Sequence, residues 1–144
     1  MQTKQDNQME STLGEQPNIL ILVTKAPFSS LEPYRAYEFA KLLNDKGINP
    51  IVFHFMDGIY NLSNLPSHAL NFQNNQMVVR DLIESGTSII ACSRCLLARG
   101  FWDENLSCIE ERRIIPSNTI KGIEVKGIQQ LLQFIYDGYK VIKF

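Results

Sequence analysis

Two cysteines separated by two residues form the part of the chain with the clearest chemical potential. Cys92-Ser-Arg-Cys95 follows the apolar run 88–91 and precedes a short stretch of helical character. Turns of this kind lie at the carboxyl edge of a sheet and are generally exposed, and a helix start favours negative charge. Because a thiolate and a persulfide are both negative, the position predicts a reactive Cys92, with Arg94 and Arg99 adding positive potential. The alternative is an inert, buried cysteine that ends a strand.

The C-x-x-C spacing is compatible with a dithiol redox pair, with half of a zinc site, or with one active cysteine and a neighbour. A zinc site needs about four ligands. Only Cys108, His54 and His68 remain as further donors, and they form no second pair, so the sequence predicts no metal. The redox interpretation stays open for Cys92 and Cys95. It fits the topology poorly, because thioredoxin-like enzymes typically place this motif after the first strand of their core, whereas here it follows about the third predicted strand.

Other residue patterns contribute little chemistry. His54 lies inside an apolar strand pattern, which favours a hydrogen-bonded core histidine over a catalytic base. The chain contains no glycine-rich dinucleotide motif, no phosphate-binding loop and no serine nucleophile motif. We therefore expect an activity without a bound cofactor.

Composition indicates a single globular domain and argues against nucleic-acid-binding, membrane-spanning and secreted classes of protein. The 144 residues suit one domain, with 44% hydrophobic and 20% charged residues and a net charge of -1. The balanced charge argues against direct nucleic-acid binding, and the longest apolar run, 19–23, is too short to cross a membrane. Three cysteines and a polar N-terminus suit a protein of the reducing cytoplasm better than a secreted disulfide framework.

The hydrophobic pattern divides the chain into a flexible polar tail, 1–17, and one α/β domain, 18–144. Apolar runs predict strands at 18–24, 50–56, 88–92, 120–125 and 139–144. Helical periodicity predicts a helix capped by Ser29 or Ser30 and ended by Gly47, and further helices over 76–85, 93–99 and from 128. The stretch 59–75 should be irregular, and 101–118 should be mixed with one more short helix. Alternation of strands and helices predicts a three-layer sandwich, in which helices cover both faces of a mostly parallel sheet of about five strands.

Several segments in this order resemble the DsrE/DsrF-like family of sulfur-relay proteins. The run from Cys92 to Glu104 (CSRCLLARGFWDE) resembles the cysteine-helix segment of DsrE and TusD. Asp57 to Asn61 is similar to the loop after the family's second strand, and Asp137 to Phe144 is similar to its last strand. The resemblance covers nearly the whole chain after the tail.

The resemblance implies a sulfurtransferase that carries sulfane sulfur on Cys92 and passes it to TusA-like or DsrC/TusE-like carriers. It also implies a trimer or hexamer, made of one chain or of sister subunits. Tyr60, Asn61 and Phe28 would line the mouth of the site. Cys95 stands where TusD-like proteins have a small apolar residue, and Cys108 is additional. A thiol-disulfide oxidoreductase that uses both thiols of the C-x-x-C, or a non-catalytic subunit of a DsrEFH/TusBCD-like complex, are the alternatives.

Overall fold

The computed structural model of the protein describes residues 14–64 and 75–144. Residues 1–13, most of the predicted tail, lie outside this description. The same holds for residues 65–74, which include His68 and much of the stretch predicted to be irregular. Within the described residues, no helix is long and apolar enough to span a membrane.

Five strands form one sheet in which every neighbouring pair is parallel. The strand order is β4-β3-β2-β1-β5. The strands are β1 (Ile19–Val23), β2 (Ile51–His54), β3 (Ser88–Cys92), β4 (Glu124–Lys126) and β5 (Lys140–Lys143). The three inner strands are continuous apolar runs because helices or loops cover them on both sides. The predicted fold class is confirmed.

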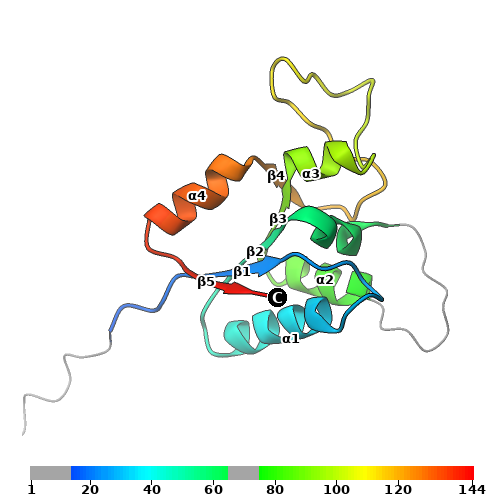
Figure 1. The fold of residues 1–144 in the computed structure, drawn as a ribbon. Helices are drawn as coiled ribbons and strands as arrows, with labels where there is room; N and C mark the ends of the chain where they lie inside the picture. The colour runs from blue at the N-terminus through cyan, green and yellow to red at the C-terminus, as the bar shows by residue number, and fades with distance from the viewer. Residues whose placement is uncertain (1–13, 65–74) are drawn as a thin grey trace, which may run out of the picture.

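The connections place the helices on both faces of this sheet (Figure 1). The helical segments are α1 (Glu32–Asp45), the 3-10 helix η1 (Met56–Leu62), α2 (Asn75–Glu84), α3 (Ser93–Ala98) and α4 (Ile128–Tyr136). The chain steps from β1 to β2 to β3 in one direction, and right-handed crossovers therefore bring α1 and α2 together on one face. The return from β4 to β5 spans the sheet in the other direction, so α4 lies on the opposite face.

Four local predictions are wrong in detail. Leu31 rather than a serine is the N-cap of α1, although the Ser30 hydroxyl accepts a hydrogen bond from the Glu32 N–H at 3.0 Å. The chain after β2 turns at once into η1, which shortens the predicted strand and orders the start of the stretch predicted to be irregular. The fourth strand begins at Glu124 because the chain turns at Gly122, where φ is +93°. Residues 101–118, all described, contain turns and isolated bridges and no helix.

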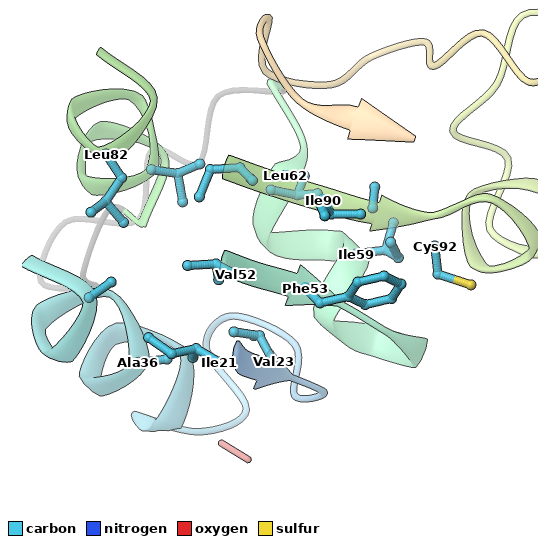
Figure 2. Packing of buried hydrophobic residues seen from close by; sticks show 14 of the residues in the cluster. Ile21, Val23, Ala36, Val52, Phe53, Ile59, Leu62, Leu82, Ile90 and Cys92 are labelled. Atoms are coloured by element: carbon cyan, nitrogen blue, oxygen red, sulfur yellow. The ribbon is translucent and has the colours of Figure 1, made fainter. Parts of the chain in front are cut away.

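The core lies between the sheet and its covering helices, and Figure 2 shows part of it. The apolar face predicted for α4 is only partly buried. Leu131 is buried, whereas Leu132 and Ile135 remain 59% and 49% exposed. Tyr136 is 88% exposed beside them in the sequence, so α4 presents an apolar stripe to solvent.

Candidate functional site

Cys92 ends β3 and is the N-cap of α3 (Figure 2). The β-branched run before it forms the strand, and the turn into α3 sets the cysteine at the carboxyl end of the sheet. Its side chain is 1% exposed, so the expectation of an exposed thiol is wrong for this structure. Local sequence does not determine this burial, and η1 is one element that packs against both β3 and α3. Among the described residues the Cys92 side chain makes no capping hydrogen bond to α3.

Cys95 lies in the first turn of α3 and is 5% exposed. Its Sγ accepts a hydrogen bond from the Met56 N–H of η1 at 3.2 Å. Burial raises the pKa of the Cys95 thiol to about 11, and its hydrogen bond with the Cys92 side chain acts in the same direction. The Met56 N–H and the Arg99 charge act in the opposite direction and do not offset burial. Cys95 is therefore a neutral thiol at neutral pH.

An ion pair joins α3 to η1 next to the two thiols. The Arg99 Nη2 lies 2.7 Å from Asp57 Oδ1, and the Arg99 Nε lies 3.1 Å from the same oxygen. The guanidinium carbon is also 6.0 Å from the ring centroid of Tyr60, which packs edge-on against Phe101 at 5.7 Å. The Arg99 side chain is 16% exposed, and its ion pair with Asp57 holds its charge against η1.

Two further sets of contacts fix the position of η1, one with β1 and the other with the loop after β1 and the start of α2. Gly58 packs so closely on β1 that a Cβ at this position would collide with the Val23 carbonyl. The buried Asn61 amide donates to the Lys25 carbonyl at 2.8 Å, and its oxygen accepts from the Asn75 amide at 3.0 Å. Asn61, predicted to line the site, therefore uses its side chain to tie η1 to the loop after β1 and to the start of α2.

Of the other residues predicted for the site, Tyr60 lies next to Arg99, whereas the rest lie elsewhere on the surface or in loops. Tyr60 is brought to Arg99, as described, and remains 41% exposed. Arg94 is exposed on α3. Phe28 lies in the loop after β1 with a φ of +69° and is 49% exposed. Cys108 belongs to the long loop 101–118 that projects beyond α3 in Figure 1, and its thiol donates a hydrogen bond to Glu110 at 3.5 Å.

His54 is a core residue, as its position in an apolar strand predicts. It is fully buried, and the Ile90 carbonyl lies 3.1 Å from its Nδ1. A carbonyl only accepts, so Nδ1 carries the proton and Nε2 accepts from the Tyr37 hydroxyl at 2.8 Å. Burial lowers the pKa of His54 to about 4, and the Ile90 hydrogen bond opposes this shift only in part. His54 is therefore neutral at physiological pH.

Sequence reasoning did not select Asp57 or Met56 as parts of the site. Asp57-Gly58 directly after a strand was a signal for a turn at the sheet edge. The pairing of Asp57 with a residue 42 positions away depends on the fold and has no local signal. Within the described parts of the chain, no cluster of three His, Cys, Asp or Glu side chains could hold a metal ion.

Comparisons with known proteins agree with this architecture. The sequence profile of the DsrE/DsrF-like family matches residues 18–144. The chain belongs to the DsrE/DsrF-like family. This family is associated with sulfur relay, and the resemblance inferred from the cysteine-helix segment is confirmed.

Solved structures with the same fold include the YchN protein of E. coli, with a TM-score of 0.73 and 19% identity over 90% of this chain and 100% of that chain. Another is MTH1491 of Methanobacterium thermoautotrophicum, a protein of unknown function, with a TM-score of 0.63 and 14% identity over 90% and 100% of the two chains. An uncharacterized protein of Methanopyrus kandleri is 24% identical over 126 residues, which are 88% of this chain and 93% of that protein. These likenesses establish the DsrE-like fold of the chain.

Proposed function

We propose that this DsrE-like protein is a sulfurtransferase subunit that carries sulfane sulfur on Cys92. The observation that carries the proposal is the position of Cys92 at the carboxyl end of an inner strand and at the start of α3. Chemistry in parallel α/β sheets gathers at this edge. Membership of a sulfur-relay family supports the same chemistry.

The proposed reaction is thiol exchange at sulfur. The Cys92 thiolate attacks the outer sulfur of a donor persulfide, R–S–SH, which forms Cys92–S–SH and releases the donor thiolate R–S⁻. The partner's cysteine thiolate then attacks the outer sulfur of Cys92–S–SH, takes the sulfur and restores the Cys92 thiolate. Both steps conserve atoms and electrons, and they need no cofactor.

The burial of Cys92 adds one requirement to this reaction. A thiol that is 1% exposed cannot reach a cysteine on another protein without local opening. We take η1 as the cover because it packs against both β3 and α3, and the Asp57–Arg99 ion pair and the Met56–Cys95 hydrogen bond fasten it to α3. We infer that η1 moves when a carrier protein docks.

The proposed partners are TusA-like or DsrC/TusE-like carrier proteins of the cytoplasm, each of which would present a cysteine to this edge of the sheet. Assembly into a trimer or hexamer is part of the proposal. The exposed apolar stripe of α4, made of Leu132, Ile135 and Tyr136, supports assembly because a face of this kind is stabilised when another subunit covers it.

The direct test is intact-protein mass spectrometry after reaction with tetrathionate or with a persulfide donor. Tetrathionate should leave a Cys92–S–S–SO₃⁻ adduct, whose first sulfur is the Sγ of Cys92, and release thiosulfate. We expect the added sulfur on the wild type, on Cys95→Ser and on Cys108→Ser, and none on Cys92→Ser. Sulfur loading on Cys92→Ser that equals the wild type would refute the proposal.

A thiol-disulfide oxidoreductase is the second candidate, and the position of Cys92 and Cys95 three residues apart at the start of α3 favours it. Both cysteines are free thiols in this structure, at the spacing of a redox pair. In the same experiment this activity would appear as loss of two hydrogens from the wild type, without an adduct. A non-catalytic subunit, which the burial of Cys92 favours, would show neither change.

A further inference from the structure

The long loop 101–118, which we call the arm, is ordered by its own hydrogen bonds. A bridge joins Trp102 to Pro116, close to the two ends of the arm. Nearer its middle, the backbone groups of Cys108 and Arg113 exchange two hydrogen bonds, of 2.8 and 2.9 Å. Loops longer than about 12 to 15 residues are uncommon in compact domains, and those that are ordered usually have a function.

The tip of the arm exposes two large apolar side chains. Leu106 is 58% exposed and Ile109 is 54% exposed. Figure 1 shows the arm beyond α3 and apart from α4. Because the backbone of the arm is already held in place, contact of its tip with another molecule costs little conformational entropy. The arm is therefore preorganised for a contact between molecules.

The exposed stripe of α4 is a second apolar surface, and it extends onto the edge strand β5. Val141 of β5 is 39% exposed. Side chains alternate along a strand, and Phe144, three positions later, contacts Phe39 of α1. Val141 therefore points to the opposite face of the sheet, which is the face that α4 covers. A single copy of the chain leaves this whole surface open to solvent.

We propose that the arm of one copy packs on the α4 stripe of the next copy of this chain. The contact is heterologous, because it joins two different surfaces, and it closes into a ring when the rotation between copies permits. It covers both apolar surfaces in every copy of the ring, whereas a contact between two stripes leaves every arm exposed. This inference rests on the assembly included in the proposed function and identifies the surfaces that meet.

The distribution of charge favours contact of the arm with α4 over contact between two arms. The arm contains four acidic and two basic side chains, whereas α4 contains no charged residue. Lys126, shortly before α4, and Lys143, on the same face of β5 as Val141, are exposed at the borders of the stripe. Neither lysine forms an ion pair with another described residue. Acidic arms repel one another and are attracted to these lysines.

Light scattering of variants with a new charge at an exposed position tests the contact. Ile109→Glu on the arm and Leu132→Glu on the stripe should each lower the measured mass at least twofold. Leu42→Glu is the matched control, because Leu42 lies on α1 and is 61% exposed, and it should keep the wild-type mass. Leu106→Glu replaces Ile109→Glu if circular dichroism shows that the latter is unfolded. A wild type with the mass of one chain, or a folded arm variant with the wild-type mass, would overturn the inference.

A mixture of the two variants distinguishes a heterologous contact from a contact between identical surfaces. Leu132→Glu retains an intact arm, and Ile109→Glu retains an intact stripe. An equimolar mixture should therefore form a complex with about twice the mass of either variant alone. In NMR spectra of ¹⁵N-labelled Leu132→Glu, unlabelled Ile109→Glu should shift the amide signals of the arm, even where the complex is too weak for light scattering. A mixture that shows neither change would overturn the inference.

Sulfur loading measured on the same variants separates this inference from the proposed carrier function. Neither Ile109 nor Leu132 belongs to the site around Cys92, so both variants should load sulfur as the wild type does. Absence of loading together with the expected masses would refute the carrier function and support the contact. Normal loading with unchanged masses would refute the contact and support the carrier function.

Discussion

Acidification should destabilise this protein through His54, a group with no role in the proposed chemistry. The pKa of His54 is about 4 in the folded chain and 6.5 in the ordinary, unfolded state. Between these values the unfolded chain binds a proton that the folded chain excludes, so stability falls as pH falls through this window. The whole shift corresponds to about 3 kcal/mol, and about 2 kcal/mol of it should be lost between pH 7 and pH 5.

Urea unfolding at pH 7 and pH 5 measures this loss. The wild type should lose about 2 kcal/mol more than His54→Gln, in which the titrating ring is absent. His68→Gln, which removes the other histidine of the chain, is the matched control and should behave as the wild type. Equal losses in the wild type and His54→Gln would refute the reasoning. NMR titration of the wild-type ring gives an independent check, and a His54 midpoint near pH 6.5 would also refute it.

Three further outcomes follow from the cover and from the exposed face of α4. Asp57→Asn removes one charge of a partly exposed ion pair that is worth about 1 kcal/mol at most, so alkylation of Cys92 by iodoacetamide should become up to about fivefold faster; no change would mean that the pair does not hold η1. Gly58→Ala should destabilise the protein by about 3 kcal/mol in urea unfolding and speed the same alkylation, whereas Gly14→Ala, with open space around it, should do neither. Leu132→Glu places a charge in the apolar stripe and should reduce the mass measured by light scattering to that of a smaller assembly, and an unchanged mass would exclude this stripe from the interface.

The sequence predicted the strand, turn and helix around Cys92 well because each has a strong local signal. The run Ser88–Cys92 is uniformly apolar after its first residue, and the next residues favour a helix. The environment of Cys92 had no such signal. Its burial depends on tertiary packing. The neighbouring segment η1 lies 30 to 36 positions earlier in the chain, and its 3-10 geometry has no apolar periodicity of its own.

The contrast between local and tertiary signals also holds for α4, for the stretch 101–118 and for His54. The pattern of α4 correctly predicted a helix, yet it does not distinguish an apolar face against the sheet from one available to another subunit, and Leu132 and Ile135 are exposed. In 101–118 the Asp103 carboxylate accepts from the N–H groups of Asn105 and Leu106, which forms a turn where a short helix was expected. His54 was predicted correctly because an ionisable residue in a buried strand must have hydrogen-bond partners.

The cover over Cys92 has a consequence for the lifetime of any sulfur carried there. Small oxidants react with an exposed persulfide at a rate set by its nucleophilicity, and abundant low-molecular-weight thiols attack its sulfur as nucleophiles themselves. Beneath η1 the rate of such loss is multiplied by the fraction of time that the segment is open. A docked carrier that stabilises the open form would raise this fraction only for itself. The closed segment would thus act as a kinetic filter, so that delivery to the correct partner outcompetes loss of sulfur to the solvent.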